Sequence, residues 1–186
     1  MDRFIRGLAG VVLAAALAVG APDPARAQGY FGAGFGWTKA DLGDIEDLPG
    51  VEVDDESMAL RLVAGYRFWH VLALELFYTD LGAFSAGSGI LKVDAKGEGY
   101  SALVFLPLGD GADLFAKAGV YRWDVTGTGE RKQTEPVYGL GLQLPSRDRA
   151  FGIRFEYERY VDVGKDIGGS EGIDVDVFSA NLIYSF

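Results

Sequence analysis

Residues 173–186 alternate between apolar and small polar side chains with a period of two. The apolar positions are Phe178, Ala180, Leu182, Tyr184 and Phe186. The positions between them are mostly Ser and Asn, with Val177 and Ile183 as exceptions. Because successive side chains of a β-strand point to opposite faces, this alternation predicts a strand with one apolar and one polar face. Such a strand either buries its apolar face in a water-soluble fold or turns it toward lipid.

Seven earlier segments repeat the alternation, and none has convincing helical periodicity. They cover residues 30–40, 57–68, 71–81, 93–106, 113–125, 136–144 and 151–161. In 93–106 two assignments compete, one with Tyr100, Ala102, Val104 and Leu106 on the apolar face, the other with Ser101, Leu103 and Phe105. We favour the first set. Each segment suits a tilted strand that crosses a bilayer in roughly 9–11 residues.

The connections between these segments alternate in length. Short turns are expected around Trp69 and His70, at 107–112 and at 145–148, whereas the other gaps are longer and rich in Gly, Asp and Glu. Transmembrane barrels have short turns on the periplasmic side and longer loops outside. The sequence therefore predicts an all-β fold, an eight-stranded antiparallel up-and-down transmembrane β-barrel with both ends of the chain on the short-turn side.

Residues 1–27 have the pattern of a signal peptide. Arg3 and Arg6 form a charged start, 8–19 is apolar, and 25–27 read Ala-Arg-Ala before the expected cleavage. The alternative is an uncleaved anchor helix, although the apolar run is short for a span of ~20 residues. No later apolar run is long enough for a transmembrane helix, so residues 28–186 are expected to form one barrel domain.

Composition narrows the possible functions. The chain has 186 residues, one His and no Cys, which excludes disulfides and thiolate metal sites and leaves little for zinc or His-based catalysis. After removal of 1–27, 14 bases and 25 acids remain, a net charge of −11. Nucleic acid is not an expected partner, because its phosphates require a basic face.

The chain resembles the small OmpA/Opa-like outer-membrane barrels. The segments that resemble them are YFGAGFGW, GYRFWHVLALELFYTDLG, VYGLGLQLP, FGIRFEYERY and the final LIYSF. The resemblance implies the Gram-negative outer membrane, with its lipid and lipopolysaccharide as partners. It also implies that the terminal aromatic residues Tyr184 and Phe186 are an assembly signal for the barrel assembly machinery. The peptidoglycan-binding domain that many OmpA proteins add is not expected here.

Charged side chains fall on the face opposite the apolar one. They are Arg61, Arg67, Glu75, Lys117, Arg154, Glu156 and Glu158. Eight strands enclose an interior that side chains nearly fill, so these charges must pair. We expect Arg61 to meet Glu75 across neighbouring strands, and Lys117 to reach Glu156 across the lumen with Arg154 as a rival. The favoured interpretation is a structural polar plug; the alternative is a gate in which exchanged pairs open a narrow ion path.

Two features could suggest other chemistry. Residues 41–56 contain eight acids and no base, and a cation could use Asp44, Asp47, Asp54 and Asp55. The spacing is not that of an EF-hand, so a solvated acidic extracellular loop without metal or cofactor is favoured. His70 lies in a predicted periplasmic turn, away from outer-leaflet lipid, so an enzyme is not expected.

Aromatic residues near the strand ends are typical of interfacial girdles. They are Trp37, Tyr66, Phe68, Trp69, Tyr78, Tyr184 and Phe186. Three functions remain open. The first is a structural or surface-interaction barrel with an unnamed extracellular partner, the second a small pore or a transporter of small or apolar molecules, and the third a soluble lipocalin-like binder. Charged or small lumen residues disfavour an apolar ligand cup.

Overall fold

The computed structural model describes residues 27–41, 53–54, 56–68, 71–86, 91–109, 111–125, 134–146, 150–163 and 173–186. The described residues form nine strands. They are β1 (Ala27–Asp41), β2 (Val53–Asp54), β3 (Glu56–Phe68), β4 (Leu72–Ala86), β5 (Leu91–Pro107), β6 (Asp113–Val125), β7 (Thr134–Pro145), β8 (Phe151–Val163) and β9 (Ile173–Ser185). No helix in these ranges is long and apolar enough to cross a membrane.

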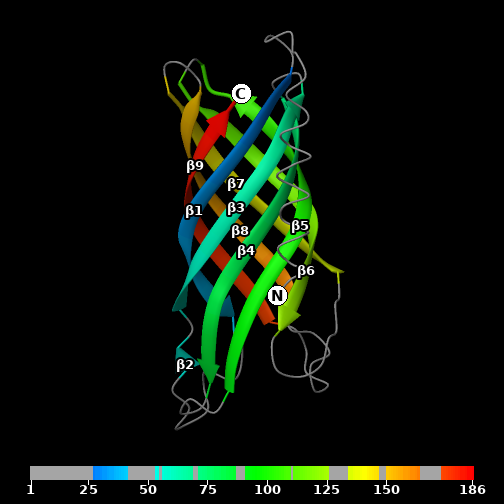
Figure 1. Ribbon diagram of the computed structural model, residues 1–186, viewed down its shortest axis with the longest axis vertical. Helices are drawn as coiled ribbons and strands as arrows, with labels where there is room; N and C mark the ends of the chain where they lie inside the picture. Colours follow the sequence, from blue (N-terminus) through cyan, green and yellow to red (C-terminus); the bar gives the residue numbers. More distant parts are fainter. Residues whose placement is uncertain are drawn as a thin grey trace.

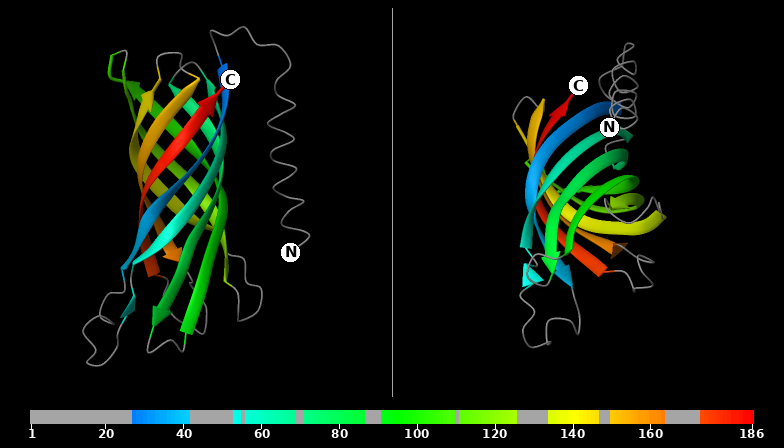
Figure 2. Two further views of the ribbon diagram at one scale, coloured as in Figure 1. Left: turned by 60° about the vertical axis from the view of Figure 1, so that its left-hand side comes forward. Right: turned by 60° about the horizontal axis from the view of Figure 1, so that its bottom comes forward.

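Eight of the strands close into a barrel (Figures 1 and 2). Each long strand pairs antiparallel with its neighbours in sequence, and β1 pairs with both β3 and β9, which closes the sheet. The predicted eight-stranded antiparallel barrel is therefore confirmed. The remaining strand, β2, was not predicted; it pairs with β4 through Val53 and Ala86 and through Asp54 and Ser85.

The two ends of the barrel differ. At one end, which we call the short-turn end, β3, β5 and β7 lead into brief connections, closed by bonds such as Leu108 N to Ala112 O at 2.8 Å. The chain also finishes there, where Phe186 N donates to Gly29 O at 2.9 Å. The opposite end, the loop end, is the one toward which β4 and β5 extend at the bottom of Figure 1. The register shifts there, between Asp80 and Ala83 in β4 and between Tyr160 and Val163 in β8.

The barrel is apolar outside. Phe35, Leu74 and Leu140 are about as exposed as side chains on a free surface, at 61%, 59% and 57%. In β5 Tyr100 and Val104 point outward, whereas Leu103 and Phe105 are buried, so the favoured assignment of this strand agrees with the structure. An exposed apolar band around the barrel is what lipid contact requires, and the core of the molecule is the barrel interior.

Glycines on the inner side of β1 let β1 and β9 approach closely. A Cβ added to Gly34 would lie 2.2 Å from the Ala180 carbonyl oxygen, and one added to Gly36 would lie 2.1 Å from that of Phe178. Real Cβ atoms do not come this near to a backbone oxygen, so no side chain fits at either position without moving the strands. The alternating Gly of this segment is thus a requirement of the closing seam.

Candidate functional site

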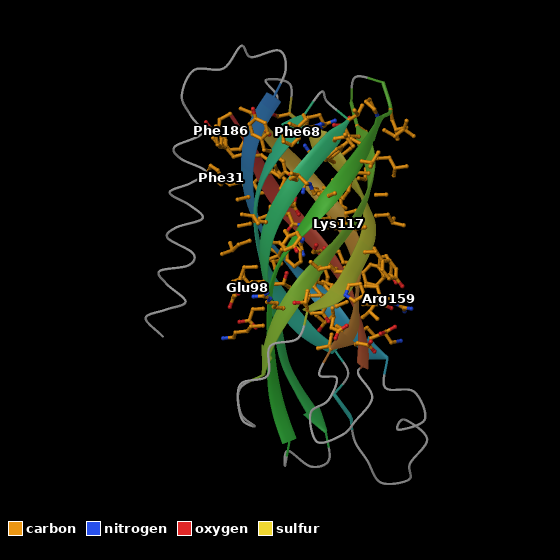
Figure 3. All side chains as sticks on the ribbon, turned by 90° about the vertical axis from the view of Figure 1, so that its right-hand side faces the viewer. Phe31, Phe68, Glu98, Lys117, Arg159 and Phe186 are labelled. Atoms are coloured by element: carbon orange, nitrogen blue, oxygen red, sulfur yellow. The ribbon has the colours of Figure 1, made fainter. Side chains whose placement is uncertain are left out.

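Six charged side chains are buried inside the barrel. They are Arg61 on β3, Glu75 on β4, Lys117 on β6, and Arg154, Glu156 and Glu158 on β8. Each occupies the inward position of its strand, and Figure 3 shows Lys117 at mid-height. We call these six residues the charge cluster. It contains three cations and three carboxylates, so its formal charges cancel.

Glu75 accepts the hydrogen bonds and ion pairs on one side of the charge cluster. Its Oε2 accepts bonds from Arg154 NH1 at 2.6 Å and from the Tyr30 hydroxyl at 3.0 Å, and Lys117 Nζ lies 3.2 Å from its Oε1. The expected Arg61–Glu75 contact is longer, at 3.5 Å. It is diagonal, because the strand register sets Arg61 opposite Thr79 and Glu75 opposite Gly65.

Glu158 and Glu156 form the ion pairs on the other side of the charge cluster. Arg61 NH1 donates to Glu158 Oε2, and Lys117 Nζ lies 2.7 Å from Glu158 Oε1. Lys117 also meets Glu156 at 3.2 Å across the lumen, and Arg154 meets the same carboxylate at 3.3 Å. Lys117 and Arg154 thus share Glu156 rather than compete for it. Each charge of the cluster has a partner of opposite sign within 3.3 Å.

Neutral side chains accept further hydrogen bonds from Arg61 and Arg154. Arg61 NH1 donates to the Tyr160 hydroxyl at 2.8 Å and to Thr79 Oγ1 at 3.2 Å. Arg154 donates through Nε and NH2 to Gln143 Oε1 at 3.0 and 2.9 Å. The alternation places Gln143 on the inward face, but the sequence interpretation did not single out Thr79, Tyr160 or Tyr30. Their inward position in the alternation was the signal that could have found them.

Aromatic rings pack against the cluster. The guanidinium of Arg154 lies 5.0 Å from the Tyr30 ring and 5.2 Å from the Phe115 ring. Arg61 and Lys117 lie 4.9 and 5.5 Å from Phe77. Rings attract cations through their negatively charged faces. They also replace water around the ion pairs, which strengthens the attraction between opposite charges.

Arg67, the seventh lumen candidate, is separate from the cluster. Its NH1 donates to Asp113 Oδ2 at 2.7 Å, and its guanidinium stacks 3.9 Å above the Phe105 ring. Both partners of this ion pair are partly exposed, at 14% and 16% of the side chain. Phe105 in turn contacts Phe115 at 5.3 Å between ring centroids. These aromatic rings lie between Arg67 and the charge cluster.

The metal candidates do not form a site in the described part of the chain. Asp44, Asp47 and Asp55 lie outside the described residues, as does His70. Asp54 lies in β2, where its backbone pairs with Ser85. Within the described ranges no group of three or more His, Cys, Asp or Glu side chains could hold a metal ion.

The terminal aromatic residues lie together at the short-turn end, where Figure 3 shows Phe186. The Tyr184 ring is 5.2 Å from Phe31, 5.1 Å from Phe151 and 6.2 Å from Phe186. These aromatic rings connect β1 with β9 across the closing seam, and β9 with its other neighbour, β8. They face outward, as expected for side chains in a membrane interface.

The family model for the OmpA-like transmembrane domain matches residues 24–186. The chain belongs to the OmpA-like transmembrane domain family. No curated protein sequence matches it. An OmpA-like barrel in the outer membrane is therefore the class of this protein, and the soluble lipocalin-like alternative is wrong.

Solved structures share the fold of this OmpA-like barrel. Ail, the attachment invasion locus protein of Yersinia pestis, is similar with a TM-score of 0.54 at 16% identity, over 87% of this chain and 99% of Ail. Neisserial surface protein A matches with 0.54 at 18%, over 86% and 97%. The N-terminal barrel of Pseudomonas aeruginosa OprF matches with 0.54 at 12%, over 85% and 97%. Family and neighbours together point to the Gram-negative outer membrane.

Proposed function

We propose that this protein is a structural or surface-interaction barrel of the outer membrane, with a lumen sealed by the charge cluster. The observation that carries this proposal is the balance and burial of the cluster: three cations and three carboxylates, each paired, at the centre of the barrel. An unpaired charge would need water or an ion beside it, whereas a balanced and bonded set is stable without either.

The surroundings of the cluster support a seal rather than a pore. Phe105 and Phe115 pack toward the short-turn end, and Phe77, Tyr121 and Tyr160 form a second aromatic group, with Tyr121 and Tyr160 at 4.9 Å. A continuous water path would have to pass both groups and the ion pairs. A carrier for apolar molecules would need an apolar cup in place of the cluster.

The membrane context completes the proposal. Residues 1–27 are removed on export, the barrel contacts outer-membrane lipid and lipopolysaccharide, and Tyr184 and Phe186 engage the barrel assembly machinery. The short-turn end faces the periplasm, and the acidic loops face outside as the interaction surface. The attachment role named for Ail is compatible with such an arrangement. Catalysis has no part in it.

The test is conductance of the refolded protein in a planar lipid bilayer. A sealed lumen predicts a membrane current at the level of protein-free lipid over the whole range of applied voltage. A variant that removes one ion pair of the cluster, Arg61→Ala with Glu158→Ala, is the matched positive control, because it replaces the pair by small side chains and leaves the charge balanced. Steady conductance of the unchanged protein would contradict the seal and favour the pore.

A further inference from the structure

Two buried polar atoms beside the charge cluster have complementary bonding needs. Arg61 Nε is a donor and Asn181 Oδ1 is an acceptor, and neither makes a hydrogen bond with any of the described residues. Both side chains are almost completely buried, since Arg61 is 1% and Asn181 is 2% exposed. A buried polar group without a partner is costly, because it has given up its bonds to water. Each of these atoms therefore requires a partner inside the barrel.

The two other buried side-chain atoms that make no hydrogen bond in the described ranges differ from this pair. Glu158 Oε1 lies 2.7 Å from Lys117 Nζ, so its charge is compensated. Ser101 Oγ is on β5, which lies opposite β9 in the order of strands around the barrel. Arg61 and Asn181, by contrast, are on β3 and β9, the two strands that flank β1.

Asn181 and Arg61 lie in one row of the ladder with a glycine between them. Asn181 pairs with Gly34 on β1, and Gly34 pairs with Arg61. The Cα atoms of Asn181 and Arg61 are thus separated by two strand spacings, about 9–10 Å. A Cβ added to Gly34 would lie 2.4 Å from Asn181 Oδ1. The amide oxygen therefore leans over the glycine, toward β3.

The Arg61 side chain reaches the same place from the other side. Its NH1 donates to Glu158 Oε2 and to the Tyr160 hydroxyl, both on β8. Because β1 and β9 lie between β3 and β8 in the sheet, the side chain has to cross the lumen above these two strands. The inward residues there are small, with Gly34 on β1 and Ser179 on β9. Nε precedes NH1 along the side chain, so it lies over this stretch.

A third polar group completes the surroundings. Glu156 Oε2 lies 3.6 Å from Arg61 Nε, which is too far for a direct hydrogen bond. Water commonly bridges polar groups that stand this far apart. Glu156 is the ladder partner of Ser179, the residue two positions before Asn181 on β9. One donor and two acceptors thus surround the position over Gly34.

We propose that one water molecule is bound over Gly34, between Arg61, Asn181 and Glu156. The water accepts a bond from Arg61 Nε and donates its two protons to Asn181 Oδ1 and Glu156 Oε2. Three bonds are what a buried protein water typically makes. A cation does not suit the site, because Arg61 Nε needs an acceptor and the formal charges of the cluster already cancel. The inference rests on the proposed seal, since an open lumen would exchange this water freely with bulk solvent.

The test is a water NOE measurement by NMR on the refolded full chain, labelled with ¹⁵N, in detergent micelles. The Arg61 Hε proton should give a cross-peak to water with opposite signs in NOE and ROE spectra, which distinguishes a bound water from proton exchange. Arg154 is the matched control inside the same cluster. Its Nε donates directly to Gln143 Oε1 at 3.0 Å, so its Hε should give no such cross-peak. Loss of the signal in Arg61→Lys assigns it.

A variant removes the acceptor. Asn181→Leu should abolish the Arg61 cross-peak, because the new side chain occupies the place of the water and offers it no bond. Absence of the cross-peak in the unchanged protein, or its persistence in Asn181→Leu, would overturn the proposal. If Asn181→Leu fails to fold, the comparison of Arg61 with Arg154 decides the question.

The same spectra separate this inference from the proposed seal. Equal water cross-peaks at Arg61 and Arg154 would overturn the single site, and together with a steady current across a planar bilayer they would overturn the seal as well. No cross-peak at Arg61 in a protein that passes no current would overturn the bound water and leave the seal intact.

Discussion

Glu75 has contacts with all three cations of the charge cluster and with the Tyr30 hydroxyl. A carboxylate that accepts so many charge-assisted bonds compensates a large part of the positive charge around it. If its charge is removed, Arg61, Lys117 and Arg154 share two carboxylates, and the interior has a net charge of +1. A single uncompensated charge in a buried site is far costlier than a missing pair.

The first prediction concerns this residue. Glu75→Gln should lower the free energy of unfolding by about 3–5 kcal/mol, measured by urea unfolding in lipid vesicles. Adding Arg154→Gln should restore part of the loss, because Arg154 makes the shortest contact to Glu75 and the charges balance again. Asp113→Asn is the matched control and should cost less, since its ion pair with Arg67 is partly solvated and lies outside the charge cluster. Strictly additive effects of the Glu75 and Arg154 changes would show that the two residues do not interact.

The second prediction concerns an outward residue. Leu74 is 59% exposed in β4, and Leu74→Arg should cost ~2–4 kcal/mol because it puts a charge against the lipid chains. Leu108→Arg makes the same exchange in the turn after β5, outside the apolar band, and should be nearly neutral. Urea unfolding in vesicles measures both. Equal costs at the two positions would mean that the exposed face of β4 does not meet lipid.

At the scale of elements, the seam between β1 and β9 is a close backbone contact with a clear sequence cause. Gly34 faces Ala180 O and the Asn181 side chain at distances that exclude a Cβ. This pairing joins the first and last strands of the described chain and is needed for the sheet to close into a barrel. The glycines of β1 therefore affect closure of the whole barrel, although they contribute no side-chain contact of their own.

The third prediction tests this seam. Gly34→Ala should destabilise the barrel by ~1–3 kcal/mol, as expected for overpacking against an unyielding backbone. Gly97→Ala in β5 is the control, because its Cβ would meet Tyr121 at an ordinary 3.4 Å. The measurement is the midpoint of thermal unfolding in detergent micelles. A larger effect at Gly97 than at Gly34 would contradict the steric role of the seam.

The strands were predictable from sequence because a period of two is visible wherever one face meets lipid. The β5 alternation was ambiguous because Leu103 and Phe105 are apolar lumen residues beside outward Val104 and Leu106. Strand β2 was missed, since a two-residue pairing has no periodicity. The bulge near Asp162, with a φ of 57°, likewise depends on how β8 and β9 meet.

The candidate site was predictable in its members but not in its pairings. The alternation of side chains along each strand shows which charged residues point inward. Which of them pair depends instead on the stagger between strands, which the sequence does not show. That stagger makes Arg61–Glu75 a long diagonal contact and brings Glu158 to Arg61 and Arg154 to Glu75. Neutral partners such as Gln143 and Tyr160 have no charge to mark them in sequence.

At the scale of the whole molecule, the barrel has an apolar outside, an ionic inside and two unlike ends. Trp37 and Phe178 mark the outward surface near the loop end, and Phe31, Tyr184 and Phe186 mark it near the short-turn end. In the proposed orientation, the apolar band spans the bilayer and the longer connections lie outside the cell.

The most direct test is labelling of single-cysteine variants on whole cells with a membrane-impermeant thiol reagent, since the chain has no cysteine of its own. The positions in the longer connections are Asp47, Ser88, Gly129 and Gly169, and those in the short turns are Asp110 and Ser146. The account predicts that cysteines in the first set react on intact cells and that those in the second react only after the outer membrane is opened. The reverse pattern, or equal reaction of both sets on intact cells, would contradict it.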